Sequence, residues 1–588
     1  MSRPNAADDH PCRGYGAHLL DDGRACFRLW APDAGQVELL LHGTARPMWR
    51  EDGGDHVLVA GAAAGDRYAY RVDGRRVPDP ASRLQPDGVH GDSAVDDPAA
   101  YDWRHRDWRG RPWREAVICE LHAGAMGGFD GVRRALPRLA ACGYTALELM
   151  PVAAFDGARN WGYDGVLPYA PHPAYGTPTA LRALVDEAHG LGLMVLLDVV
   201  YNHFGPSGNE LPRYASGFFR ADRPTAWGSA IDFRRPQVAR YFVDNALMWL
   251  RDYHLDGLRL DAVHAIEPRG FLEHLAAEVR RACAGREAHL VLENEHNDAG
   301  LLRGGYDAQW NDDAHNALHV LLTGEREGYY ADFAADPTAA LATALGEGFV
   351  FQGQRDRRGV ARGEPAAGLP PEAFVLFLQN HDQVGNRPLG ERLTALADPR
   401  DLRAATALVA LCPMVPLFFM GEECGCTTPF LYFTDYDGEL AGQVREGRRA
   451  EFAQFAGFAD PARRARIPDP NAPRSFAGSI PAVDDPVAAA RHAQWFAHLL
   501  SLRKARVGMQ AGAAHALGCR VLAERALHAR WRLADGSRWE LALNLSDRDV
   551  VLPGDAAAGV VHGEPADAFL PAQRLLRPHA LVALAEAR

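Results

Sequence analysis

The sequence lacks the features that place a protein in a membrane or send it across one. No stretch reaches the roughly 18 uninterrupted apolar residues that a membrane-spanning helix needs. The first residues, Met-Ser-Arg-Pro-Asn-Ala-Ala-Asp-Asp-His, contain no apolar core of a secretory signal peptide. From these two absences we expect a cytoplasmic protein without a membrane partner.

Clusters of one charge sign are missing as well. The formal net charge is -13, and it is spread over the chain without a long acidic or basic run. A protein that binds nucleic acid would gather its Lys and Arg residues on one face. The charge distribution therefore argues against a nucleic-acid partner, and mild acidity of this kind serves solubility.

Cysteines are few, at nine in 588 residues, and they are scattered. Their odd number and apolar surroundings, as around Cys119, favour free thiols in a reducing compartment. Cys424 and Cys426 form the only close pair, and no further Cys or His lies at zinc-binding spacing. The sequence also has no calcium-loop or Gly-rich phosphate-binding pattern, so we expect neither a metal nor a cofactor.

The length and patterning of the chain predict several domains. At 588 residues, 47% apolar and 24% charged, it is a globular chain too long for one ordinary domain. Residues 1–98 read as short strands between turns, which predicts an N-terminal Ig-like β-sandwich of the carbohydrate-binding type. Residues 99–114 read as a linker, 115–505 as an α/β domain, and 506–588 as a C-terminal β-domain, which we expect to be a β-sandwich.

Residues 115–505 alternate short apolar strands with longer helical patterns. Strands are expected at Val117–His122, Thr145–Met150, Leu193–Val200, Gly257–Asp261, His289–Glu293, Ala308–Asn311, Phe374–Asn380 and Val415–Met420. Helices are expected at Val132–Ala141, Ala180–His189 and Val238–Leu250, and a loop at 361–371. Nearly continuous apolar runs are typical of parallel strands buried on both faces. About eight such units favour a closed (β/α)₈ barrel over an open sheet.

Polar side chains follow four of these strands where each strand ends. They are Asp198 with His203, Arg259 with Asp261, Glu293, and Asn380 with His381 and Asp382. In barrel enzymes the reacting groups gather at the carboxyl ends of the strands. A single Asp there could simply cap a helix. Four such strand ends in succession point instead to one shared pocket.

Paired carboxyl groups are what cleavage of a glycosidic bond requires. One acts as nucleophile or base and the other as acid, on either side of an oxocarbenium-like transition state. Arg259 precedes Asp261 by two residues and so shares its face of the strand. We expect its charge to keep Asp261 ionised, which suits a nucleophile.

These sequence blocks resemble those of the α-amylase superfamily of glycoside hydrolases, in the same order and over essentially the whole chain. The blocks are Asp198-Val-Val-Tyr-Asn-His203, Gly257-Leu-Arg-Leu-Asp261, Glu293 and Asn380-His-Asp382. The resemblance implies that Asp261 is the nucleophile, Glu293 the general acid/base and Asp382 the transition-state stabiliser. It also implies that Arg259, His203 and His381 surround the reacting sugar while Asp198 braces the site.

Longer stretches resemble one branch of that superfamily, the maltooligosyltrehalose trehalohydrolases. They include Asn160-Trp-Gly-Tyr-Asp164, Gln379-Asn-His-Asp-Gln-Val-Gly-Asn-Arg387 and Thr428-Pro-Phe-Leu-Tyr-Phe-Thr-Asp435. The resemblance implies hydrolysis of the α-1,4 bond next to a terminal trehalose, with retention and a carboxyl separation of about 5–5.5 Å. The implied functional partner is the synthase that makes maltooligosyltrehalose, without implied contact. Glycogen branching or debranching enzymes and a non-catalytic glucan-binding protein are the alternatives, although the last should have lost a carboxylate.

Further residues are expected to bind maltooligosyltrehalose or related α-1,4-glucans. We expect Tyr163 to pack on the sugar at the cleavage point. The remaining candidates are Asp164, His264, Asn380, Gln383, Arg387, Glu423 and the possible sugar platforms Trp161, Trp227 and Phe430, for which core packing is the alternative. Cys424 stands where the relatives usually carry Trp, which we expect to reshape part of the substrate groove or its backing.

Overall fold

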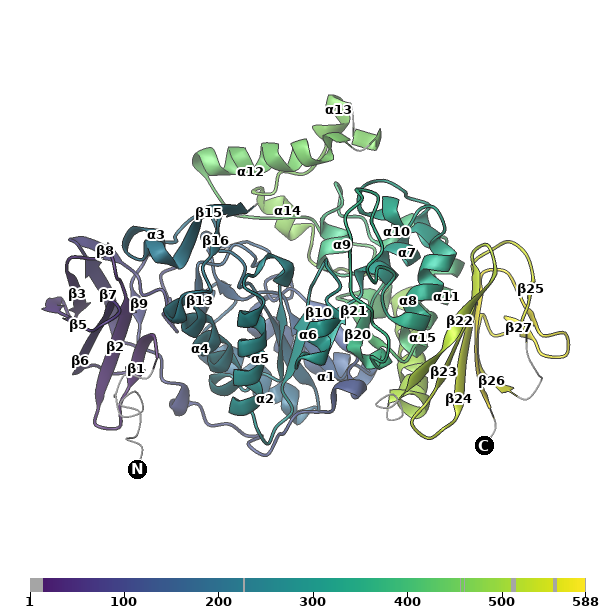
Figure 1. The fold of residues 1–588 in the computed structure, drawn as a ribbon, viewed down its shortest axis with the longest axis horizontal. Helices are drawn as coiled ribbons and strands as arrows, with labels where there is room; N and C mark the ends of the chain where they lie inside the picture. Colours follow the sequence, from purple (N-terminus) through teal and green to yellow (C-terminus); the bar gives the residue numbers. More distant parts are fainter. Residues whose placement is uncertain are drawn as a thin grey trace.

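The computed structural model describes residues 14–225, 228–454, 456–458, 460–508, 514–553 and 558–586. An N-terminal group of strands, a central barrel and a C-terminal group of strands follow one another along the long axis (Figure 1). Of the helices that the structure describes, none combines the length and apolar character needed to cross a membrane.

Eight parallel strands close into the central barrel, as the apolar runs predicted. They are β10 (Ile118–Leu121), β11 (Ala146–Leu149), β14 (Met194–Val199), β17 (Gly257–Leu260), β18 (His289–Leu292), β19 (Ala308–Trp310), β20 (Phe374–Leu376) and β21 (Val415–Phe419). Every residue of these strands is buried, which explains why the sequence shows no alternation of polar and apolar residues there. The (β/α)₈ prediction is confirmed.

Amphipathic helices cover the outside of the barrel. The main ones are α1 (Gly128–Cys142), α2 (Pro178–Gly190), α4 (Pro236–Asp252), α5 (Gly270–Ala282), α7 (Asp312–Thr323), α8 (Pro337–Glu347), α11 (Pro399–Leu411) and α15 (Pro486–Arg506). Local sequence sets their ends: Thr177 caps α2 by accepting from the amide of Ala180 at 3.1 Å. Gly143 ends α1 with φ of 108°, which favours glycine. The three predicted helices are confirmed as α1, α2 and α4.

Two facing sheets form the N-terminal β-sandwich. One has the strand order β1-β2-β6-β5, and the other has β4-β3-β7-β8 with β9 paired to β7. The strands are β1 (Gly16–Leu19), β2 (Arg24–Trp30), β3 (Val37–Leu41), β4 (Thr44–Pro47), β5 (Trp49–Arg50), β6 (Asp55–Gly61), β7 (Arg67–Val72), β8 (Arg75–Val77) and β9 (Ser93–Ala94). Side chains such as Phe27, Leu39 and Tyr70, each at 0% exposure, fill the space between the sheets.

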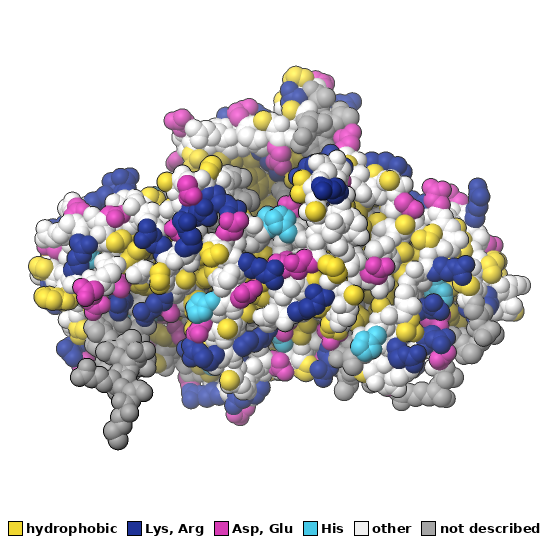
Figure 2. Space-filling model, viewed as in Figure 1, with side chains coloured by type: hydrophobic (Ala, Val, Ile, Leu, Met, Phe, Trp, Pro, Cys, Tyr) yellow, Lys and Arg dark blue, Asp and Glu magenta, His cyan; other side chains and the backbone are white. Residues whose placement is uncertain are grey.

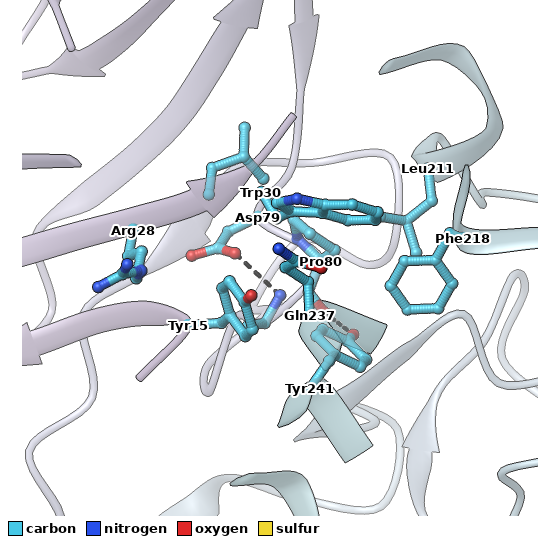
Figure 3. Close-up of a pocket in the computed structure, with 11 residues that line it drawn as sticks. Tyr15, Arg28, Trp30, Asp79, Pro80, Leu211, Phe218, Gln237 and Tyr241 are labelled. Atoms are coloured by element: carbon cyan, nitrogen blue, oxygen red, sulfur yellow. Dashed lines mark hydrogen bonds between the residues drawn. The ribbon is translucent and has the colours of Figure 1, made fainter. Parts of the chain in front are cut away.

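The sandwich packs tightly against the barrel. Tyr241 of α4 donates its hydroxyl to the carbonyl of Pro80 at 2.6 Å, and the ring of Trp30 lies 6.2 Å from that of Phe218 (Figure 3). The cavity between these groups measures about 10 Å³, room for roughly one water molecule. This junction is therefore a packed interface and leaves no space for a sugar.

The C-terminal β-domain consists of a five-stranded and a three-stranded sheet. Its strands are β22 (His515–Ala523), β23 (Ala526–Arg532), β24 (Arg538–Asn544), β25 (Val550–Val551), β26 (Ala558–Glu564), β27 (Phe569–Leu570), β28 (Leu575–Leu576) and β29 (Ala580–Glu586). The buried Trp539 donates its indole N–H to the carbonyl of Leu411 at 3.0 Å, which ties this domain to α11. β-rich domains thus flank the barrel on both sides, as predicted.

A segment between β21 and α15 leaves the barrel and crosses above it. Its helices α12 (Gly438–Glu451) and α13 (Pro461–Arg464), here called the arm, lie over α9 (His381–Gly385) and α14 (Pro473–Ala477) (Figure 1). The hairpin of β15 (Phe219–Thr225) and β16 (Gly228–Ile231) lies at the same end of the barrel. Figure 2 shows a hollow beneath the arm. The sequence patterns did not predict this overhang.

The cysteines correct one prediction in part. Cys119, Cys142, Cys283, Cys412, Cys424, Cys426 and Cys519 are free thiols, as expected. Cys26 on β2 is instead disulfide-bonded. Scattered positions in a sequence do not show which two cysteines a fold brings together, so the expectation of free thiols was wrong for Cys26.

Candidate active site

Three carboxylates from neighbouring strands meet at the guanidinium of Arg259. Its Nη1 lies 2.7 Å from Asp198 Oδ2 and 2.9 Å from Asp261 Oδ1, and its Nη2 lies 2.9 Å from Glu293 Oε2. Arg259 is completely buried and packs over the ring of Trp310 at 4.2 Å. Because β14, β17 and β18 are adjacent and parallel, residues far apart in sequence meet at one end of the barrel.

The turn after β17 fixes the position of Glu293. Ala262 has φ of 41°, in the left-handed region that non-glycine residues rarely adopt. Its amide donates to Glu293 Oε2 at 2.8 Å, and the amide of Val263 donates to the backbone carbonyl of Glu293 at 3.0 Å. The strained turn thus holds the Glu293 carboxylate beside Asp261.

His381 and Asp382 enter the site on the short helix α9. Asn380 caps this helix by accepting from the amide of Gln383 at 2.9 Å. The Nδ1 of His381 lies 2.5 Å from Glu120 Oε1, and its Nε2 lies 3.4 Å from Asp382 Oδ1. The cap therefore places the imidazole and the carboxylate side by side at the end of β20.

Tyr163 and His203 brace the opposite side of the site. The hydroxyl of Tyr163 donates to Asp198 Oδ2 at 2.5 Å, and its ring stacks on His381 with centroids 5.0 Å apart. The Nε2 of His203 lies 2.9 Å from the carbonyl of Tyr163. Because a carbonyl can only accept, this nitrogen of His203 carries a proton.

Exposure separates the reacting carboxylates from the bracing one. The side chains of Asp261, Glu293 and Asp382 keep 13%, 19% and 36% of their surface exposed. Those of Asp198 and Arg259 keep only 2% and 0%. The first three carboxylates can therefore touch a substrate, whereas Asp198 lies behind them.

The two carboxyl groups beside Arg259 titrate together. Burial and then the charge of Glu293 raise the pKa of Asp261 well above its usual range. For Glu293, burial alone would raise the pKa, but the charge of Arg259 and the amide of Ala262 lower it. The expectation that Arg259 keeps Asp261 ionised was wrong, because the guanidinium is shared among three carboxylates. The pKa values of the two groups are therefore shifted in opposite directions.

The other acidic and basic groups of the site are shifted by burial and by their neighbours. Burial raises the pKa of Asp198 and of Asp382. Burial lowers the pKa of His203 to about 4, so this ring is neutral at pH 7. Although burial alone would lower the pKa of His381, the charges of Glu120 and Asp382 raise it to about 9. The site thus contains one neutral and one cationic imidazole.

Two predicted sugar platforms turn out to be packing residues. Trp161 is 4% exposed and stacks on Phe430, which is 0% exposed, with ring centroids 5.4 Å apart. Its indole N–H donates to the carbonyl of Leu431 at 2.9 Å. Neither ring presents a free face to a sugar, so both Trp161 and Phe430 are core-packing residues, which was the alternative to a sugar platform. Trp227, the third aromatic candidate, lies outside the described residues.

Glu423 lies in the barrel wall, away from the cluster at Arg259. It is 2% exposed, forms an ion pair with Arg138 of α1 at 2.6 Å and accepts from the amide of Gly421 at 3.0 Å. Cys424 donates its thiol to the carbonyl of Gly421 at 3.2 Å, within a turn that packs on α15. The structure therefore gives both residues contacts in the barrel wall, without bringing either to the carboxylates.

The remaining candidates surround the carboxylates more loosely. Asp164 accepts from the side chain of Asn160 at 2.6 Å, and Arg387 forms a two-point ion pair with Glu325 at 2.7 and 2.9 Å. His264 follows Asp261 on the next turn, and its charge is among those that lower the pKa of Glu293. Asp164 and Arg387 thus have protein partners, whereas His264 lies within electrostatic range of the reacting pair.

Four residues that sequence reasoning did not select also belong to the surroundings of the site. Glu120 contacts His381, and Asp312 carries a pKa raised to about 8 by burial and by the charge of Glu293. The sequence offered a signal for both residues. Glu120 is a lone charged residue within an apolar strand, and Asp312 is an acidic residue that follows a strand. Asn386, which donates to Asp382 at 3.1 Å, and Arg448 of the arm lie in stretches that resemble the family, but neither was selected as a site residue.

Within the part of the chain that the structure describes, no group of three or more His, Cys, Asp or Glu side chains could hold a metal ion. The arrangement that is present consists of carboxylates, one guanidinium and two imidazoles. Groups of this kind can carry out nucleophilic and acid–base chemistry through their own atoms.

A barrel with these carboxylates at its strand ends defines a glycoside hydrolase of the α-amylase type. Residues 96–215 match the family model described as the alpha amylase catalytic domain, and residues 514–582 match a domain of unknown function named DUF3459. A Salmonella typhimurium protein described as an alpha amylase has a crystal structure with a TM-score of 0.92 at 40% identity. That comparison covers 98% of this chain and 100% of the other.

Curated relatives narrow the class further. A malto-oligosyltrehalose trehalohydrolase from Deinococcus radiodurans is 43% identical, covering 80% of this chain and 79% of that protein. One from Saccharolobus solfataricus is 41% identical, covering 74% of this chain and 80% of that protein. The chain belongs to the malto-oligosyltrehalose trehalohydrolase family.

Proposed function

We propose that this chain is a retaining hydrolase that cleaves the α-1,4-glucosidic bond next to the terminal trehalose of maltooligosyltrehalose. The products are trehalose and a maltooligosaccharide, which places the reaction in trehalose biosynthesis. The observation that carries the proposal is the cluster of Asp261, Glu293 and Asp382 at the open end of the barrel, in a chain of this family.

The first half of the reaction breaks the glycosidic bond. A carboxylate oxygen of Asp261 attacks the anomeric carbon and forms a covalent glycosyl ester. Glu293 donates its proton to the glycosidic oxygen, so that trehalose leaves as a neutral alcohol. The two groups lie on the two terminal nitrogens of the same guanidinium, close enough to flank one glycosidic bond.

The second half hydrolyses the ester. Glu293, now a carboxylate, takes a proton from a water molecule while the oxygen of that water attacks the anomeric carbon. The bond to Asp261 breaks, the free carboxylate returns and the maltooligosaccharide keeps the α configuration. Two inversions at one carbon account for the retained configuration.

The first step requires one ionised carboxylate, on Asp261, and one protonated carboxyl, on Glu293. Without substrate, burial and the charge of Glu293 raise the pKa of Asp261, while Arg259 and the amide of Ala262 lower that of Glu293. The glycosidic oxygen accepts a hydrogen bond from a protonated Glu293, which draws the proton to the acid.

The surrounding residues position and stabilise the sugar. Asp382 faces the positive charge that develops at the ring, and the Nε2–H of His381 is directed at Asp382 and the sugar hydroxyls, while Arg259 and Asp198 hold Asp261 in place. Tyr163 covers the cleavage point. The other proposed contacts to the glucan are His203, Asp164, His264, Asn380, Gln383 and Arg387.

The biological setting completes the proposal. The substrate is an α-1,4-glucan capped by trehalose, supplied by a maltooligosyltrehalose synthase that acts before this enzyme without needing to touch it. We place the enzyme in the cytoplasm. The seven free cysteines support a reducing compartment, while the disulfide at Cys26 weighs against it.

Product analysis tests the proposed reaction. Maltooligosyltrehalose and a plain maltooligosaccharide of equal length are each incubated with the enzyme, and the products are separated. We expect rapid release of trehalose from the first and slow attack on the second. Equal rates would indicate a general amylase, and new α-1,6 linkages with little trehalose would indicate a branching enzyme.

Asp261→Asn provides the control for the nucleophile. This substitution keeps the size of the side chain and removes its nucleophilic charge, so turnover should fall by at least ~10³-fold. Circular dichroism and the unfolding midpoint should stay near those of the parent enzyme. Substantial residual turnover in a pure preparation would contradict the assignment of Asp261.

A further inference from the structure

Glu120 lies beneath the active site on β10, in a strand that is otherwise apolar. Its Oε1 lies 2.5 Å from His381 Nδ1, and its Oε2 accepts from the backbone amide of His381 at 2.9 Å. Both residues are 1% exposed. One carboxylate thus holds both the backbone and the ring of His381 from below.

We propose that Glu120 is a positioning residue that acts through His381, keeping the ring protonated and its Nε2–H directed at Asp382 and the reacting sugar. The proposal rests on the function proposed above and deepens it. Glu120 itself touches His381 and no reacting atom, so its effect on the reaction passes through the imidazole.

The geometry favours an N–H on both sides of the ring. A carboxylate lies at each nitrogen of His381, with Glu120 2.5 Å from Nδ1 and Asp382 3.4 Å from Nε2. A neutral imidazole has only one N–H and would turn a lone pair toward one of the two carboxylates. The imidazolium form donates toward both, so this form fits the space between them.

Aromatic rings prevent His381 from turning out of this arrangement. Tyr163 stacks on it with centroids 5.0 Å apart at 20°, Trp161 meets it edge-on at 5.5 Å, and Trp310 lies 6.1 Å away. Trp161 also packs closely against Gly385 on the same helix, because a β-carbon at that glycine would come within 2.1 Å of the Trp161 ring. The faces of the aromatic rings also favour a cation between them.

The titratable groups that face His381 come from several strands of the barrel. They are the carboxyl groups of Glu120, Asp382, Glu148, Asp198 and Glu293, the guanidinium of Arg259 and the neutral imidazole of His122. Of these groups in the described part of the chain, Glu120 alone makes two close contacts with His381. Its charge should therefore affect the protonation of this ring more than that of any other barrel residue beneath the site.

Glu148 offers a matched control for Glu120. The two residues are register partners on adjacent strands, and both are buried inside the barrel. Within the described residues neither carboxyl oxygen of Glu148 has a hydrogen-bond partner, and burial together with the charge of Glu120 raises its pKa well above the usual range. Glu148 is therefore protonated, so replacing it by Gln changes no charge.

The experiment measures kcat/KM against pH for E120Q and E148Q with maltooligosyltrehalose. Loss of the negative charge at residue 120 lowers the pKa of His381, so the alkaline limb of the profile should move to lower pH. We expect kcat at pH 8 to fall roughly tenfold or more in E120Q, the size of one lost electrostatic interaction at a transition state. E148Q should keep the profile of the parent enzyme.

A double-mutant cycle tests whether Glu120 acts through His381. E120Q should lower kcat much less in an H381Q background than in the parent, because its effect passes through the missing ring. Equal losses in both backgrounds, or the same alkaline shift in E148Q as in E120Q, would overturn the proposal. Release of trehalose by the parent enzyme is measured separately. If the parent releases no trehalose, the double-mutant cycle is measured with another α-glucan that the enzyme hydrolyses, so that failure of the proposed function and failure of this proposal can be told apart.

A second variant, E120D, tests the proposal in case E120Q does not fold. E120D keeps the charge but is one methylene shorter, so it cannot make both contacts with His381 at their present lengths. We expect a several-fold lower kcat, with an alkaline limb closer to that of the parent than to that of E120Q. If E120Q does not fold, an E120D enzyme with the kcat of the parent would overturn the proposal.

Discussion

At the scale of single residues, Arg259 organises the site by serving three carboxylates with one guanidinium. A cation that pairs with a single carboxylate lowers the pKa of that group. Here the charge is divided among Asp198, Asp261 and Glu293, while burial disfavours each ionised form. Arg259 therefore lowers the pKa of each carboxyl group less than it would in an isolated pair, and burial raises the pKa of Asp198 and Asp261. Retaining cleavage needs one protonated carboxyl for the leaving group.

The pH dependence of catalysis follows from this sharing. The negative charge of Glu293 is a cause of the raised pKa of Asp261, so removing it should lower that pKa. Catalysis by Asp261 needs its ionised form, so the acid limb of kcat/KM should move to lower pH in E293Q. The measurement uses a glycosyl fluoride, whose leaving group needs no proton from Glu293. An acid limb that stays in place or moves to higher pH would show that Glu293 does not repel Asp261.

At the scale of elements, the short helix α9 connects the catalytic residues to the arm. It carries His381 and Asp382, and Asn386 at its end donates to Asp382 at 3.1 Å. Arg448 of α12 donates to the carbonyl of Gly385 at 2.6 Å and lies 3.4 Å from Asn386 Oδ1. The arm is thus fastened to the same helix that presents the stabilising carboxylate.

Loss of Arg448 should therefore weaken catalysis from a distance. Arg448 is 8% exposed, and a hydrogen bond from a buried cation is worth about 1.5–3 kcal/mol. We expect R448A to lower kcat/KM for maltooligosyltrehalose by about tenfold or more, since 1.4 kcal/mol corresponds to a factor of ten. R449A is the control, because Arg449 on the same helix contacts Glu446 at 3.1 Å. Equal effects of the two substitutions would contradict a special role for Arg448.

At the scale of the whole molecule, buried polar contacts hold the three parts of the chain together. Tyr241 joins the sandwich to the barrel, and Trp539 joins the C-terminal sheet to α11. The linker contributes Trp108, whose indole N–H donates to Asp256 at 2.7 Å. Each contact satisfies a group that would otherwise be buried without a partner, so separating the parts would be costly.

The junction between sandwich and barrel can be tested without touching the catalytic residues. Y241F removes the hydroxyl that donates to Pro80, which leaves a buried carbonyl without this donor. We expect the free energy of unfolding to fall by about 1–3 kcal/mol, measured by denaturant unfolding. The kcat should remain that of the parent enzyme. An unchanged stability would mean that this hydrogen bond does not help to hold the junction.

The sequence by itself determined the barrel and the carboxylates at its strand ends. Eight apolar runs predict parallel strands because a strand buried on both faces has no polar side, and the polar residues that follow them must then meet at one end. Asp261, Glu293 and Asp382 could be found in this way, because their positions depend on strand order and not on fine packing.

Only the tertiary structure decided what depends on neighbours distant in sequence. It divided the charge of Arg259 among three carboxylates, buried Trp161 against Phe430 and paired Glu423 with Arg138. It also brought Glu120 beneath His381 and the arm over α9. The physical reason is that periodicity reports which face of an element is buried, whereas a pKa, a stacking partner or an ion pair depends on which groups face it across the fold.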